Sequence, residues 1–319
     1  MNRVGYNLLM IANFLLFTVG IIILLFSTEY LAQFSSKMWA ALKLSPLIVG
    51  CTLVAIGTSL PEMAVSVTAV LKGDQGLAVG NILGSNVANI LLVLAVGILL
   101  GHISIGVSKT QKTALMMLLA TGLYLCLNLV IESPKILGLL LFLSALLFSF
   151  IEIVMGVKGR EHEDKSFVAH KRSCLRPEMV GKIGVIVCGV ILGGIIVVRS
   201  IEEISLLSGY STTVLGLSIT AIATSMPELL TIVFCRRKDQ KKVAIGSILG
   251  SNIYNLLLVG GIIQFFSPVK PIFDKNLFFL IFSAVSGTIL VFAYADKKVP
   301  KKIGFTLLFL FAVYIFTLR

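Results

Sequence analysis

Two glutamates, Glu62 and Glu228, are the residues best placed for chemistry, because each lies deep inside an apolar stretch. Both end the same five-residue pattern, T-S-x-P-E, at residues 58–62 and 224–228. A charge at such depth in a membrane is costly, so these residues usually line a cavity or an ion pathway. A single glutamate could instead be protonated and bound to a neighbouring helix. Two glutamates in the same pattern favour a pathway.

Each pattern also supplies oxygen ligands beside its carboxylate. Pro61 and Pro227 cannot donate a hydrogen bond, so the carbonyls of Gly57 and Ala223 lose their helical partners. Within a membrane such carbonyls need partners, and a cation in an interior cavity is a suitable one. The threonine and serine lie four and three residues before the glutamate, on one helix face. Carboxylate, hydroxyl and carbonyl oxygens suit Ca²⁺ or Na⁺, whereas no cysteine–histidine cluster indicates a softer metal.

A polar stripe follows each pattern, with its residues four apart on one face of the next predicted helix. Glycines at 80, 84, 246 and 250 would let neighbouring helices approach closely. Taken alone, such a stripe could equally serve as a plain contact between membrane helices. Next to the glutamate patterns we interpret it as part of the cavity. The stripes consist of Asn81, Ser85 and Asn89 in the first copy and Ser247, Ser251 and Asn255 in the second.

These two regions are copies of one ancestral stretch. Residues 50–93 align with residues 216–259 at a constant offset of 166 and without a gap. Twenty of the 44 aligned pairs are identical, including both glutamates and both prolines. The sequence therefore predicts two equivalent halves that contribute to one site.

The composition places these motifs in a membrane. Hydrophobic residues make up 57% of the 319-residue chain, charged residues 13%, and the mean hydropathy is +1.01. About 20 apolar residues span a bilayer. We predict five spans in a first repeat (1–155), a polar linker (156–180) and five spans in a second repeat (181–319). The predicted spans are 6–27, 46–70, 79–100, 112–131, 136–155, 181–198, 212–235, 245–267, 276–295 and 301–318.

An odd number of spans per repeat makes the second repeat enter the membrane from the opposite side. With ten spans, the N-terminal side carries seven of the 27 Lys and Arg residues, and the other side carries 20. The positive-inside rule then predicts extracellular termini and a cytoplasmic linker. The same rule accounts for the net charge of +12 without nucleic acid. We expect Glu152, near the cytoplasmic end of its span, to reach water.

The motifs GTSLPE (57–62) and ATSMPE (223–228), followed by GSNVAN (84–89) and GSNIYN (250–255), resemble the α-repeats of the sodium/calcium exchanger family. The resemblance implies an all-α polytopic membrane protein in the cell membrane, with ten transmembrane helices as two inverted five-helix repeats. It implies alternating access, in which the first helix of each half slides across the rest. It also implies Ca²⁺ ligands at Thr58, Glu62, Thr224 and Glu228, Na⁺ sites completed by Ala55, Ser59, Ser85, Ala221, Ser225 and Ser251, and a centre lined by Asn89 and Asn255.

One position departs from some relatives, which carry aspartate where this chain has Asn255. The predicted pocket therefore has two formal negative charges, which one Ca²⁺ neutralises without a K⁺. Three Na⁺ would leave one positive charge, so the 3:1 exchange implied by the family would be electrogenic. The prediction is a K⁺-independent Na⁺/Ca²⁺ antiporter, with Ca²⁺/H⁺ exchange as the alternative because buried glutamates also take protons.

Other function classes fit the sequence less well. Inverted repeats with interrupted helices at mid-depth favour a transporter over a channel. An intramembrane enzyme is disfavoured because the chain contains no HExxH or GxSxG motif. We expect no cofactor and no nucleic-acid partner. The expected partners are the transported ions and the lipid bilayer, and we expect the chain to function as a monomer.

Overall fold

The structure, a computed structural model, describes residues 3–39, 55–103, 105, 109–158, 177–234, 238–266 and 275–318. Its regular elements are all helices, and three of them, labelled η, are short π-helices. The first half contains α1 (Arg3–Trp39), α3 (Ala55–Thr58), α4 (Leu60–Leu71), α5 (Gln75–Ala88), η3 (Asn89–Val93), α6 (Leu94–Leu100), α7 (Lys109–Val130) and α8 (Pro134–Lys158). The second half contains α9 (Pro177–Ser208), α10 (Thr212–Leu215), η5 (Gly216–Thr220), α11 (Ala221–Thr224), α12 (Met226–Phe234), α13 (Lys238–Tyr254), η6 (Asn255–Val259), α14 (Gly260–Phe266), α15 (Lys275–Ala293) and α16 (Lys301–Thr317).

Helix covers the described part of every predicted span to within a few residues; the segment 46–70 is described only from Ala55. Seven helical segments in the described ranges are long and apolar enough to cross a membrane. Large apolar side chains face outward, among them Leu15 (62% exposed), Phe150 (64%) and Phe309 (68%), as expected for a surface that contacts lipid. Ten crossings in two inverted sets of five, with external termini, remain a prediction.

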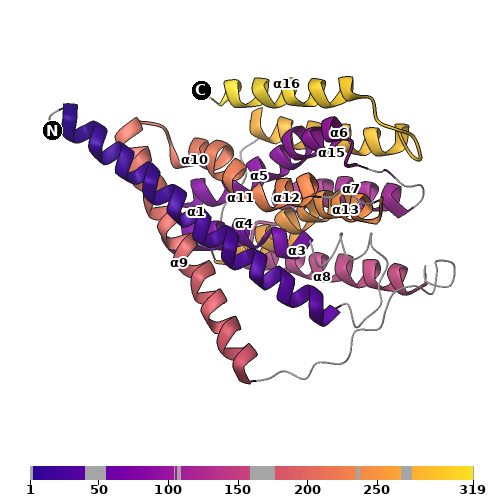
Figure 1. The fold of residues 1–319 in the computed structure, drawn as a ribbon, viewed down its shortest axis with the longest axis horizontal. Coiled ribbons are helices and arrows are strands. Elements are labelled where there is room, and N and C mark those ends of the chain that lie inside the picture. Colours follow the sequence, from indigo (N-terminus) through magenta and orange to yellow (C-terminus); the bar gives the residue numbers. More distant parts are fainter. Residues whose placement is uncertain are drawn as a thin grey trace.

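The helices α1 and α9 form a long pair that crosses one side of the molecule (Figure 1). Both extend beyond their predicted spans, as far as Trp39 and Ser208. Glycines bring them together: a Cβ built on Gly193 would lie 3.0 Å from the amide nitrogen of Leu24. A Cβ built on Gly20 would lie 2.9 Å from a methyl group of Ile196. Small residues allow this close approach between helices in a membrane.

The helices that carry the polar stripes lie at the centre of the molecule. In the spans Gln75–Leu100 and Ala244–Phe266, 83% of the most apolar window is buried, compared with 28–50% in the other candidate spans. The α5 helix packs against α10, η5 and α11, while α13 packs against α3 and α7. Each stripe is therefore enclosed by helices from both halves of the chain.

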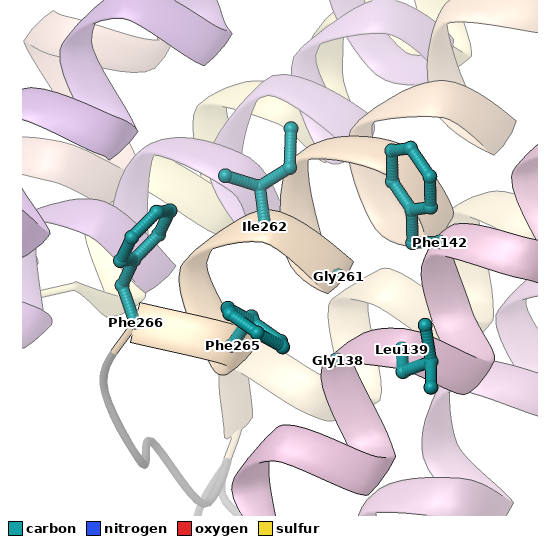
Figure 2. Close-up of a pocket in the computed structure, with 7 residues that line it drawn as sticks. All are labelled: Gly138, Leu139, Phe142, Gly261, Ile262, Phe265 and Phe266. Atoms are coloured by element: carbon teal, nitrogen blue, oxygen red, sulfur yellow. The ribbon is translucent and has the colours of Figure 1, made fainter.

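Paired glycines also bring α8 against α14. A Cβ on Gly138 would lie 2.6 Å from the amide nitrogen of Phe265 and 2.7 Å from the carbonyl oxygen of Gly261. Beside this contact lies an apolar cavity of about 220 Å³, whose walls include Phe142 and Phe266 (Figure 2). Because its lining is almost wholly carbon, we interpret this region as helix packing.

The prediction that Glu152 reaches water is wrong. Its side chain on α8 is fully buried. The residue faces α7, where the hydroxyl oxygen of Thr113 lies 3.1 Å from Glu152 Oε1. Position near a helix end did not expose it, because the neighbouring helix covers that end.

Candidate cation-binding site

Both T-S-x-P-E patterns interrupt their helices at the serine. Ser59 (φ −81°, ψ 2°) lies between α3 and α4, and Ser225 (φ −79°, ψ 7°) lies between α11 and α12. The break comes two residues before each proline, which fits at the start of the next helix because no donor is needed there. Glu62 and Glu228 are thus in the first turns of α4 and α12, where the helix dipole favours a negative charge.

The stripe helices change their winding at the central asparagines. The π-helix η3 begins at Asn89 and η6 begins at Asn255, at positions related by the offset of 166. A third π-helix, η5, directly precedes Ala221. Single π-turns inside α-helices occur frequently at functional sites, since they displace side chains from their regular positions. The amino-acid pattern gave no signal for them.

Thr58 of the first repeat contacts the stripe of the second. Its hydroxyl oxygen lies 3.1 Å from Ser251 Oγ and 3.4 Å from Ser247 Oγ. Ser251 also donates a hydrogen bond of 3.3 Å to the carbonyl of Ala55. The broken helix of one repeat is therefore joined to the polar face of the other.

Thr224 makes the equivalent contacts in the reverse direction. Its hydroxyl oxygen lies 3.4 Å from Ser85 Oγ and donates to Asn81 Oδ1 over 3.2 Å. The amide of Asn81 in turn donates to the carbonyl of Glu62 over 3.3 Å. These positions correspond to the Thr58 contacts after a shift of 166 residues, so the two halves interlock with approximate two-fold equivalence.

The two carboxylates differ in their hydrogen bonds although both are buried. Glu62 Oε1 accepts a hydrogen bond of 3.2 Å from Ser225 Oγ, while Oε2 has no partner among the described residues. The hydroxyls of Thr58 and Ser251 lie toward the Glu228 carboxylate. Neither of its oxygens has a hydrogen bond of ordinary geometry within the described part of the chain. The carboxylates are close enough for their charges to repel each other. Buried charges are stable only when paired, so this arrangement calls for a cation.

The central asparagines extend the set of available oxygens. Asn89 donates to Asn252 Oδ1 over 3.0 Å, and Asn252 donates to the carbonyl of Asn86 over 3.3 Å. Asn89 Oδ1 and both amide atoms of Asn255 lack partners among the described residues. Asn86 and Asn252 were not among the residues predicted for the site. Their signal was present, because both copies contain the triplet Gly-Ser-Asn at the constant offset.

All twelve residues predicted for the site are buried in these interlocking helices. The carbonyl of Ala55 accepts the amide of Ser59 (3.0 Å), and that of Ala221 accepts the amide of Ser225 (3.1 Å), so both alanine carbonyls have helical hydrogen bonds here. The hydroxyl of Ser59 lacks a partner in the described ranges. The twelve are Ala55, Thr58, Ser59, Glu62, Ser85, Asn89, Ala221, Thr224, Ser225, Glu228, Ser251 and Asn255.

The donor set consists of oxygens and carries few charges. Within the described residues, no group of three or more His, Cys, Asp or Glu side chains could hold a metal ion. Two carboxylates surrounded by hydroxyl, amide and carbonyl oxygens suit hard cations such as Ca²⁺ and Na⁺. Because the number of charged ligands tunes affinity, two carboxylates fit an ion that must also be released.

The family model described as sodium/calcium exchanger protein matches residues 12–154 and 180–318, which is most of the chain and includes both motifs. The chain belongs to the sodium/calcium exchanger family. This exchanger-family protein is therefore a multi-pass membrane transporter that uses no cofactor. It is 31% identical over 262 residues to the inner membrane protein YrbG of Escherichia coli, a match that covers 79% of each chain.

Other relatives match over nearly their full length. The exchanger-family chain is 26% identical over 344 residues to the sodium/calcium exchanger MaX1 of Methanosarcina acetivorans, covering 96% of this chain and 98% of MaX1. Among solved structures it is similar to the sodium-calcium exchanger NCX_Mj soaked with 10 mM Na⁺ and zero Ca²⁺. That match has a TM-score of 0.66 and 25% identity, and it covers 98% of this chain and 99% of the other.

Proposed function

We propose that this protein is a secondary antiporter that exchanges Na⁺ for Ca²⁺ by alternating access. Its family supports antiport of Ca²⁺ against another cation. The observation that carries the proposal is the pair of buried carboxylates, Glu62 and Glu228, on broken helices from opposite halves of the chain. Three of their four oxygens lack hydrogen-bond partners among the described residues. One Ca²⁺ would neutralise both charges.

We assign the ligands by the same geometry. Glu62 and Glu228, with the carbonyls of Thr58 and Thr224, would bind Ca²⁺. The remaining hydroxyls and carbonyls would complete the Na⁺ sites, and Asn89 and Asn255 would line the centre. Support comes from the burial of every member and from the reciprocal threonine contacts. The Na⁺ residues are Ala55, Ser59, Ser85, Ala221, Ser225 and Ser251.

Charge counting gives the electrical properties of the exchange. The pocket carries two negative charges because positions 89 and 255 are both asparagine. Ca²⁺ brings the pocket to zero, whereas an added K⁺ would leave it positive, so transport is K⁺-independent. If three Na⁺ exchange for one Ca²⁺, each cycle moves one net charge and transport is electrogenic.

For the conformational change we propose that α1 and α9 slide together across the remaining helices. The glycine contacts that join the two helices support their movement as a unit. The α9 helix also meets α4, where a Cβ on Gly194 would lie 3.1 Å from the carbonyl oxygen of Ala64. In this proposal both termini are extracellular and the linker 156–180 is cytoplasmic, as the distribution of Lys and Arg supports.

Ca²⁺/H⁺ exchange is the second candidate. The closeness of the two carboxylates favours it, because two neighbouring carboxylates can bind two protons in place of one Ca²⁺.

Proteoliposomes containing the purified protein distinguish the two functions. We expect an outward Na⁺ gradient to drive ⁴⁵Ca²⁺ uptake, an inside-positive potential to accelerate it, and replacement of K⁺ by choline to leave it unchanged. Glu228→Gln should stop uptake, whereas Glu132→Gln, at an exposed loop residue, should transport normally. Uptake that follows a pH gradient and ignores Na⁺ would refute Na⁺ exchange and support the second candidate.

A further inference from the structure

Glu152 is a buried carboxylate that lies outside the proposed cation site. Its side chain on α8 has no exposed surface. One oxygen, Oε1, lies 3.1 Å from the hydroxyl of Thr113, and the other has no hydrogen-bond partner among the described residues. Among the side chains that the structure describes there is one ion pair, Lys72 with Glu202, so none of these basic side chains neutralises Glu152. A buried carboxylate without a cation is stable only as the neutral acid.

The hydrogen bonds around Thr113 indicate where that proton lies. The hydroxyl oxygen of Thr113 is 3.1 Å from Glu152 Oε1 and 3.2 Å from the carbonyl oxygen of Lys109. A threonine hydroxyl has one proton, so it cannot donate fully to both oxygens. If Glu152 is protonated, its O–H donates to Thr113 and Thr113 donates to Lys109. Each of the two contacts of Thr113 is then a full hydrogen bond, whereas in the ionised form its single proton can serve only one of the two oxygens.

The charged groups on neighbouring elements do not change this conclusion. The elements packed on α8 are α7, α14 and η6, and Tyr254 at the end of α13 also contacts it. On α7 the charges are Lys109 and Lys112, neither within ion-pair distance of Glu152. The α14 and η6 sequences contain no charged residue. The charged residues of α13 all lie within 238–242, about 18 Å or more along the helix from Tyr254.

The buried acid is linked to the proposed cation site through one turn of α8. Ser149, three residues before Glu152, lies 2.9 Å from the hydroxyl of Tyr254. The ring of Phe148 also packs edge-on against Tyr254, with 5.5 Å between ring centroids. Tyr254 directly precedes Asn255, where η6 begins. A movement of α8 away from α7 would therefore act on the helix that carries the central asparagine.

We propose that Glu152 is a proton-binding site that is loaded in this packed arrangement, and that losing its proton separates α8 from α7 and slows transport. An ionised Glu152 needs water, and opening of the contact with Thr113 would admit it. Proton binding stands on the geometry alone, while the effect on transport rests on the proposed function.

Infrared spectroscopy of the reconstituted full-length protein tests proton binding directly. At neutral pH we expect a carboxylic-acid C=O band that shifts in D₂O, disappears in Glu152→Gln and moves in Thr113→Val, which lacks the hydroxyl partner. Glu132→Gln, an exposed glutamate, should leave the band unchanged. If the wild-type and Glu152→Gln spectra show the same acid bands, Glu152 is ionised and the proposal is wrong.

Transport measured from neutral to alkaline pH, with equal pH on both sides, tests the consequence. Wild-type Na⁺-driven ⁴⁵Ca²⁺ uptake should follow the protonated fraction, falling about tenfold per pH unit beyond the midpoint. Glu152→Gln, which mimics the loaded form, should keep its neutral rate, and Glu132→Gln should follow the wild type. Identical profiles for wild type and Glu152→Gln would overturn the regulatory role. If wild type shows no Na⁺-driven uptake, the proposed function fails, and the infrared result still decides proton binding.

Discussion

Replacing Gly84 by alanine places a methyl group in the seam between the two repeats. A Cβ at this position would lie 2.6 Å from the carbonyl oxygen of Leu217 and 2.7 Å from the Cβ of Ala221. The nearest atom belongs to the backbone, so a rotamer change cannot relieve the contact. Ordinary contact begins at 3.4 Å. From 2.6 to 3.4 Å, the helices α5 and η5 must separate by about 0.8 Å.

That separation would also break a cross-repeat contact. Ser85, the next residue, lies at 3.4 Å from the hydroxyl oxygen of Thr224, close to the upper limit for a hydrogen bond. Overpacking of this kind costs about 1–3 kcal/mol, and the lost hydrogen bond costs about 1 kcal/mol. We expect Gly84→Ala to lower the free energy of unfolding by about 2–4 kcal/mol and to impair Ca²⁺ transport, because Thr224 moves relative to the stripe.

Thermal unfolding of the purified protein in detergent, followed by size-exclusion chromatography, measures the stability. Gly122→Ala is the matched control, since a Cβ at Gly122 on α7 meets no atom within 4 Å. The control should be neutral or more stable by up to about 1 kcal/mol, as expected for alanine in a helix interior. If Gly84→Ala melts at the same temperature as Gly122→Ala and transports Ca²⁺ at the wild-type rate, Gly84 does not pack closely against Leu217 and Ala221.

Four further substitutions test the site and its surroundings. Glu62→Gln should abolish ⁴⁵Ca²⁺ uptake while the protein still elutes as the wild type does; normal uptake would exclude Glu62 as a ligand. Ser225→Ala should lower the melting stability by about 1 kcal/mol because Glu62 loses its hydrogen bond, whereas Ser59→Ala should leave melting unchanged and weaken the Na⁺ dependence of uptake. Equal shifts in melting temperature for Ser225→Ala and Ser59→Ala would contradict the proposed difference between the hydrogen bonds of the two serines. Lys72→Gln breaks a partly exposed ion pair with Glu202 and should change the unfolding free energy by less than about 1 kcal/mol; a larger loss in the same assay would show the pair to be structurally important.

The sequence predicted most of the described helices, and the twelve residues that it named for the site are all buried in the structure. Long apolar runs specify membrane helices because an unpaired backbone is so unfavourable in lipid. The break at Ser59 followed from the missing amide hydrogen of Pro61, and the same holds for Ser225 and Pro227. The internal repeat added a second, independent copy of each motif, which is why two buried glutamates could be distinguished from an incidental one.

Features that depend on neighbouring helices were not predictable. The π-turns at Asn89 and Asn255 arise inside ordinary apolar helix sequence, so nothing local specifies them. The repeated Gly-Ser-Asn triplet marked Asn252, but its contact with Asn89, which is 163 residues away, could not be predicted. Glu152 was expected in water because the pattern shows distance from the helix end but does not show which helix covers that end.

The reciprocal threonine contacts also set an order for the biogenesis of the protein. Thr58 and Ser251 are separated by 193 residues, so the first motif enters the membrane long before its partner has been translated. At 5–20 residues per second this interval is roughly 10–40 s. Throughout that time Glu62 lacks the second repeat that will enclose it. We therefore expect a separately expressed first half to be held by insertion chaperones or degraded, and co-expression of the second half to rescue it.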